Sequence, residues 1–183
     1  MYIASQKRKE NIAEYLLYMW QIEDIIRANG LDIDKIKKNV IDKFQLNDAQ
    51  RKEMEEWYES LIDMMRREEV EKTGHLQLNK NVIIQLTDLH LALLKDPRFP
   101  EYTAEFYKTL PFIVELRAKA GENPTGEIET CFNALYGMLM LRLQSKEVTS
   151  DTQNAITQIT RFLALLTRNF HLDQDDKLFP KEE

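Results

Sequence analysis

The chain has 183 residues, of which 31 are acidic and 25 basic, so its formal net charge is −6. It contains only five glycines and five prolines, whereas these two residues together make up about 12% of an average protein. This scarcity excludes a collagen-like or low-complexity chain and disfavours a β domain with many turns. With a hydrophobic content of 43%, the composition predicts one all-α domain with a sizeable core.

The charge and the cysteine content of the chain limit the kinds of partner it is expected to bind and the compartment in which it is expected to reside. An acidic chain is poorly suited to nucleic acid, since such binding depends on Lys and Arg at the phosphates. No apolar run approaches the roughly 20 residues of a membrane span, and the first residues lack a secretory signal. The single cysteine, Cys131, excludes an internal disulfide. We therefore expect a cytoplasmic protein that binds neither nucleic acid nor a membrane.

Apolar residues recur at spacings of three and four along most of the chain, which predicts about seven helices. We place them at 5–28, 32–44, 47–73, 80–94, 100–120, 126–145 and 151–169. The starts are marked by residues that favour the cap position, which are Asp32 or Asp34, Asn47 or Asp48, and Thr149 or Ser150. The fourth helix is apolar on nearly all sides, so we expect it to be the most buried.

Two features shape the expected architecture. Pro111 lies inside the fifth helix and predicts a kink or a split there. Connections of two to eight residues favour antiparallel neighbours. We expect a compact bundle of six to seven mostly antiparallel helices over residues 1–172, followed by a charged tail over 173–183.

Two charged residues fall in apolar stripes. At about 100° per residue, Glu23 lies within about 20° of Ile12, and Arg142 lies within about 40° of Ile128. A buried charge must be paired or neutralised, so we predict that Glu23 meets Arg142, with Arg117 as a second candidate partner.

Two interpretations of this pair stay open. One is a structural ion pair that fixes the register of the helices. The other is a polar pocket that receives a small ligand. That pocket would be lined by Glu23, Arg142, Arg117, Tyr15, Trp20 and His90.

Residues for metal binding or covalent catalysis give a weak signal. His75, His90 and His171 are the only histidines, and a joint metal site is one reading of them. However, His75 and His171 follow predicted helix ends, where a cation suits the helix dipole. Cys131 lies in an apolar stripe and is typical of a core residue rather than a nucleophile. We therefore predict no metal, no cofactor and no catalytic residue.

The first helix carries more apolar material than one face can bury. Either this helix is central in the bundle, or its outer face binds a partner protein or a second copy. The residues of that contact surface would be Tyr18, Trp20, Gln21, Asp24 and Ile25.

Residues 6–28 (QKRKENIAEYLLYMWQIEDIIRA) and 74–83 (GHLQLNKNVI) resemble an uncharacterised bacterial family that is classed as a domain of unknown function. The resemblance implies a helical bundle and a bacterial source. It brings no activity, cofactor or catalytic residue.

We therefore expect a non-enzymatic interaction or scaffolding protein that self-associates through its first helix as a homodimer. The alternative is a small-molecule-binding bundle, with or without enzymatic activity, whose pocket surrounds Glu23 and Arg142.

Overall fold

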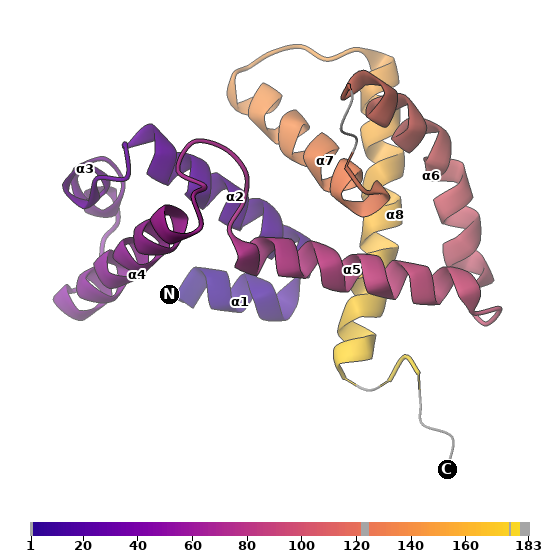
Figure 1. Ribbon diagram of the computed structural model, residues 1–183, viewed down its shortest axis with the longest axis horizontal. Helices are drawn as coiled ribbons and strands as arrows, with labels where there is room; N and C mark the ends of the chain where they lie inside the picture. Colours follow the sequence, from indigo (N-terminus) through magenta and orange to yellow (C-terminus); the bar gives the residue numbers. More distant parts are fainter. Residues whose placement is uncertain (1, 122–124, 176, 180–183) are drawn as a thin grey trace. The chain divides into compact units, whose positions relative to one another are not determined.

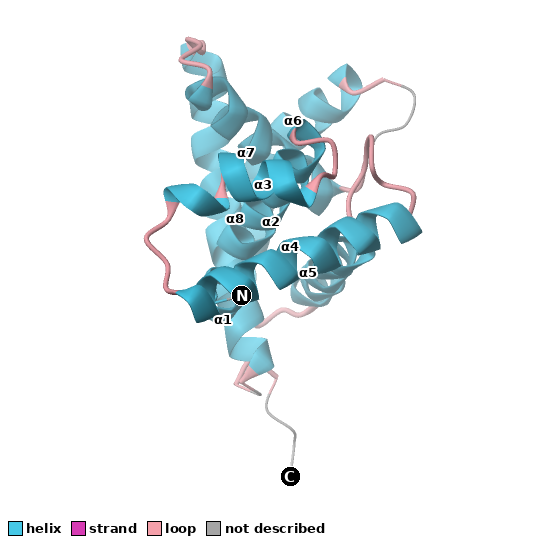
Figure 2. Cartoon of the chain, turned by 90° about the vertical axis from the view of Figure 1, so that its left-hand side faces the viewer, coloured by secondary structure: helices cyan, strands magenta, loops and turns pink. Residues whose placement is uncertain are grey.

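The computed structural model describes residues 2–121, 125–175 and 177–179, which form eight α-helices, one short 3-10 helix and no strand (Figures 1 and 2). The predicted all-α class is confirmed, with one α-helix more than expected. The chain divides into two compact units, Met1–Val82 and Ile83–Glu183, and each is described by itself. The single bundle expected over 1–172 stays a prediction.

Unit 1 is built around one buried helix. Its elements are α1 (Tyr2–Glu10), α2 (Ile12–Ala28), α3 (Ile33–Asn39), η1 (Ile41–Lys43), α4 (Asp48–Arg67) and the start of α5 (Gln77–Lys95). α1 packs on α2, while α3 and η1 pack on α4. α2 carries eight buried residues. The prediction that α5 is the most buried helix was wrong, because Ile84 and Leu91 are 52% and 46% exposed.

The helix expected over 5–28 is interrupted at Asn11. The backbone of Asn11 is extended (φ −154°), and its side chain accepts hydrogen bonds from the N–H groups of Ala13 (3.0 Å) and Glu14 (3.2 Å). Asparagine is a strong N-cap residue, so a new helix starts there. The sequence signal was Asn11 followed three residues later by Glu14.

α4 ends earlier than its pattern predicts, at Arg67 rather than residue 73. Glu69 adopts a left-handed conformation (φ +57°), and the N–H of Val70 donates back to the carbonyl of Met65 (3.0 Å). This is the hydrogen bond of a Schellman motif, and the buried Val70 supplies its usual apolar contact. Because the left-handed position holds glutamate instead of glycine, the usual sequence signal for a helix end is missing there.

Unit 2 contains the rest of α5 with α6 (Pro100–Lys119), α7 (Glu127–Leu143) and α8 (Ser150–Gln174). α8, yellow in Figure 1, packs against both α6 and α7. The core of unit 2 is aromatic. Four of its buried residues are Tyr102, Phe106, Phe132 and Phe162. α6 continues through Pro111 without a split.

The start of the segment expected as a charged tail, 173–183, belongs to unit 2. α8 continues to Gln174, Leu178 is buried, and the ring of Phe179 lies 5.7 Å from that of Phe99. Residues 176 and 180–183 of this segment lie outside the described residues.

Candidate functional site

Glu23 lies in the interior of unit 1 with no exposed surface, as its position in the apolar stripe predicted. Its Oε1 accepts hydrogen bonds from the backbone N–H of Leu76 (2.8 Å) and the side-chain amide of Asn79 (2.7 Å). Its Oε2 lies 2.6 Å from Nδ1 of His75. Two of these partners directly precede α5 and Asn79 lies in its first turn, so Glu23 joins α2 to the start of that helix.

The same carboxylate caps α5. The carbonyl of Leu76 accepts the N–H of Lys80 (3.1 Å), which makes Leu76 the N-cap residue, and Glu23 binds its N–H. A second carboxylate, from Glu68, accepts the N–H of Gln77 (2.6 Å). Helix N-termini leave N–H groups unpaired and carry partial positive charge, so two carboxylates stabilise this start.

His75 completes the cluster, and the sequence interpretation assigned it to a helix end. Its ring stacks on Trp20, with centroids 4.2 Å apart and planes 14° from parallel, and its side chain is 26% exposed. A carboxylate on Nδ1 fixes the ring, an arrangement found in general bases and metal ligands. Among the described residues, however, no three metal-ligating side chains converge.

Arg27, one turn after Glu23, holds the same loop. Its guanidinium donates to the carbonyls of Val70 (3.1 Å) and Gly74 (2.5 Å), and it also binds Asp24 (2.9 Å). The connection from α4 to α5 is therefore fixed on α2 by two charged side chains. This makes the Glu23 cluster a structural junction.

Glu23 does not depend on the predicted Arg142 for its partners. The Glu23 carboxylate is bound by its three partners in unit 1, whereas Arg142 is exposed in the last turn of α7. Helical periodicity places Arg142 on the apolar face of α7, but this face is not covered at the end of the helix, where the neighbouring Leu143 is 70% exposed. Arg117, the second candidate, is half-buried near the end of α6.

His90 lies in the aromatic core of unit 2 and is almost fully buried. Its Nδ1 is 2.6 Å from the hydroxyl of Tyr102, and its ring packs edge-on against Phe106. Burial lowers the pKa of His90, although the Glu127 carboxylate 3.5 Å from Nε2 acts in the opposite direction. A neutral imidazole suits this site.

Cys131 is buried in the same unit, as expected for a core residue. Burial raises the pKa of its thiol to about 12. Since the thiolate is the nucleophilic form, Cys131 is unsuited to nucleophilic catalysis.

The contact surface predicted on the first helix is only partly accessible. Trp20 is buried, so its expected role as an exposed anchor was wrong. Tyr18, Gln21 and Ile25 are half-buried, and Asp24 is exposed. The eight buried residues of α2 favour the alternative, a helix central to its own unit.

A different helix presents exposed apolar side chains. On α6, Tyr107 and Val114 are 62% and 57% exposed, and Pro111 between them is also exposed. Spacings of four and three place these residues on one side of the helix. We call Tyr107, Pro111 and Val114 the α6 stripe.

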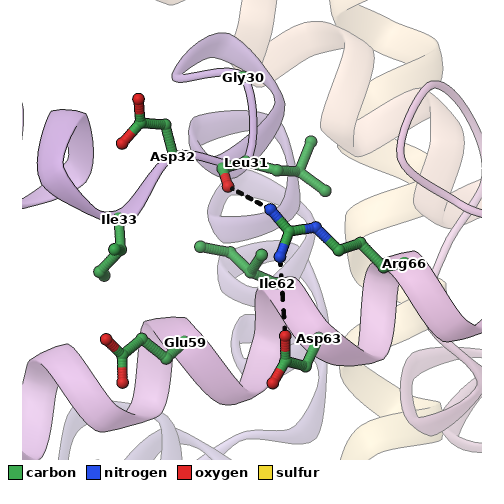
Figure 3. A pocket seen from close by; sticks show the side chains of 8 residues that line it. All are labelled: Gly30, Leu31, Asp32, Ile33, Glu59, Ile62, Asp63 and Arg66. Carbon is green, nitrogen blue, oxygen red and sulfur yellow. Dashed lines mark hydrogen bonds and ion pairs between the residues drawn. The ribbon is translucent and has the colours of Figure 1, made fainter.

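A cavity of about 570 Å³ lies between the start of α3 and the C-terminal half of α4 (Figure 3). Its polar groups serve the local structure. The Asp32 carboxylate accepts the N–H groups of Asp34 and Lys35 at the start of α3, while Arg66 donates to the carbonyl of Leu31 (3.1 Å) and lies 3.8 Å from Asp63.

Comparison with protein families identifies the class of this chain. Residues 1–177 match the family model described as Domain of unknown function (DUF4924). The chain belongs to this family. Comparison with curated proteins and with solved structures found no significant match. Within the described residues, no helix combines the length and apolar character needed to cross a membrane.

Proposed function

We propose that this protein is a helical interaction protein that acts as a homodimer and binds its second copy through the α6 stripe. The observation that carries the proposal is the exposure of Tyr107 and Val114 on one side of α6. Exposed apolar side chains gathered on one face commonly mark a protein interface, and tyrosine is frequent among interface anchors.

The charges beside the stripe favour a second copy as the partner. Lys108 stands three residues before Pro111 and Glu115 four residues after it, and both are exposed. Each also forms an ion pair on its own helix, Lys108 with Glu105 and Glu115 with Lys119. In an antiparallel pair of α6 helices centred on Pro111, each lysine faces the glutamate of the other copy. A twofold interface is self-complementary in this way.

The test is the molar mass in solution. We expect a dimer at micromolar concentration in sedimentation equilibrium. The double variant Tyr107→Ser/Val114→Ser removes the apolar contact from exposed positions, so it should be a monomer with an unchanged far-UV circular dichroism spectrum.

The matched control is Ile84→Ser/Leu91→Ser, which makes a similar change at the same spacing on α5. This variant should remain a dimer. A monomeric wild-type protein, or a dimer that survives the α6 changes, would refute the proposal.

Small-molecule binding is the second candidate function. A cavity beside α1 supports it better than the expected location at Glu23 and Arg142, since Glu23 is already bound by three partners.

A further inference from the structure

A smaller cavity in unit 1 combines a cation, two hydroxyls and an apolar wall. It lies between α1, α2 and α4, and its volume is about 180 Å³. The polar side chains, Ser5, Arg8 and Tyr15, come from α1 and the first turn of α2. The apolar wall consists of Ala4, Met19, Trp57, Leu61, Met64 and Leu78.

Arg8 brings a positive charge that no described carboxylate pairs. Its guanidinium lies 5.6 Å from the centre of the Tyr15 ring. The neighbouring Lys7 is held by Glu14 (3.0 Å). Burial raises the pKa of Tyr15, so its hydroxyl stays neutral and does not compensate the charge of Arg8.

The apolar floor of the cavity is buried, while its polar side, formed by Ser5 and Arg8, is exposed to solvent. Met19 and Leu61 are each 2% exposed, and Tyr15 is 5% exposed. For comparison, an apolar protein cavity of about 150 Å³ holds one benzene molecule. The cavity therefore has room for one compact apolar group beside a polar head.

We infer that this cavity binds a small monocarboxylic acid with an aryl or branched-alkyl tail. The carboxylate lies on the Arg8 guanidinium, whose planar donors match it geometrically, and the hydroxyls of Ser5 and Tyr15 supply further donors. The tail lies against Met19, Trp57 and Leu61. A single uncompensated cation suits a monoanion better than a phosphate dianion.

Phenylacetate is the probe, and the two tryptophans report where it binds. Trp57 lines the cavity and Trp20 does not. In nitrogen-15 NMR spectra, we expect saturable shifts of the Trp57 indole signal, assigned with Trp57→Phe, and smaller shifts of the Trp20 signal. For a ligand of this size, the expected dissociation constant is about 1 mM or lower.

Two variants and one charge-reversed ligand test the role of Arg8. Arg8→Gln should weaken phenylacetate binding at least about tenfold, whereas Lys9→Gln, an exposed position on the same helix, should leave it unchanged. Ser5→Phe should fill the cavity and abolish binding. 2-Phenylethylamine, which has a phenyl tail and a positive head, should not bind.

Three results would overturn the inference. The first is that the Trp57 signal does not shift at about 10 mM phenylacetate, which is tenfold above the expected dissociation constant. The second is that Arg8→Gln binds phenylacetate as tightly as the wild-type protein does. The third is that 2-phenylethylamine binds as tightly as phenylacetate.

Discussion

Units 1 and 2 each bury a polar cluster that contains a histidine, and they stabilise it differently. In unit 1 the buried group is the Glu23 carboxylate, which has partners 52 to 56 residues away in the chain. In unit 2 it is the His90 imidazole, whose hydroxyl partner on Tyr102 is 12 residues away. Aromatic rings pack around this imidazole, and the Glu127 carboxylate lies 3.5 Å from its Nε2. A carboxylate in the interior thus takes several donors from a distant loop, whereas a weakly basic ring can lose its charge and pack as an aromatic residue.

This difference decides how each unit responds to the loss of its polar group. Removing Glu23 leaves a backbone N–H and a side-chain amide without their acceptor. Removing His90 leaves one hydroxyl, that of Tyr102, without its hydrogen-bond partner. Each buried unsatisfied group costs about 1–3 kcal/mol, so the larger effect belongs to unit 1.

The largest expected effect is that of Glu23→Ala, which should lower the free energy of unfolding by about 3–5 kcal/mol. Tryptophan fluorescence is the measurement in urea, because Trp20 and Trp57 are the only tryptophans and both belong to unit 1. Glu56→Ala is the control, since Glu56 is exposed beside Lys52 and its loss should cost about 0.5 kcal/mol or less. A loss below about 1 kcal/mol in Glu23→Ala would show that the junction does not depend on this carboxylate.

The second prediction is that His90 makes the stability of unit 2 depend on pH. Unfolded histidine has a pKa of about 6.5, and burial places the folded pKa of His90 below that value. Below about pH 6.5 the unfolded chain therefore binds a proton that folded His90 does not. Stability present above this pH is lost as the pH falls, by at most about 1.4 kcal/mol per pH unit.

Urea unfolding followed by far-UV circular dichroism at about pH 7.5 and about pH 5.5 measures this loss. The wild-type protein should lose more stability between the two values than His90→Phe. Carboxylates with a lowered pKa, such as Asp96 beside Arg98, titrate below this window. Equal losses in the two proteins would mean that His90 titrates alike in the folded and unfolded chains.

Residues that act locally were predictable from the sequence. Asp32, Asn47 and Thr149 cap helices as expected, because a cap depends on neighbouring backbone groups. The burial of Glu23 was predictable for a similar reason, since helical periodicity alone places it in an apolar stripe.

The partners of Glu23 were not predictable in this way. His75, Leu76 and Asn79 lie more than 50 residues away. The packing on α2 of the loop before α5 and of the first turn of α5 brings them to Glu23. Helical periodicity also places Arg142 on an apolar face, yet the last turn of α7, which contains it, is exposed. Periodicity identifies the face of a helix but not the length over which another element covers that face.

The smallest expected effect concerns helix ends, where the units are alike. Glu69 after α4 and Ser145 after α7 have left-handed backbones, with φ of +57° and +53°. The equivalent position after α2 is Gly30, with φ of +66°. A side chain in this conformation costs about 1–2 kcal/mol relative to the right-handed one, whereas glycine adopts it freely.

Glu69→Gly and Ser145→Gly should therefore each stabilise the protein by about 0.5–1 kcal/mol, since part of the gain is offset by the greater freedom of glycine in the unfolded chain. Tryptophan fluorescence follows the first variant and circular dichroism the second, both in urea. Gln144→Gly is the control, because Gln144, the residue before Ser145, has a φ of −87° and glycine there should cost about 0.5–1 kcal/mol. If Glu69→Gly destabilised the protein while Ser145→Gly stabilised it, the Glu69 side chain would contribute contacts that outweigh its backbone strain, and the helix ends of the two units would differ as their buried clusters do.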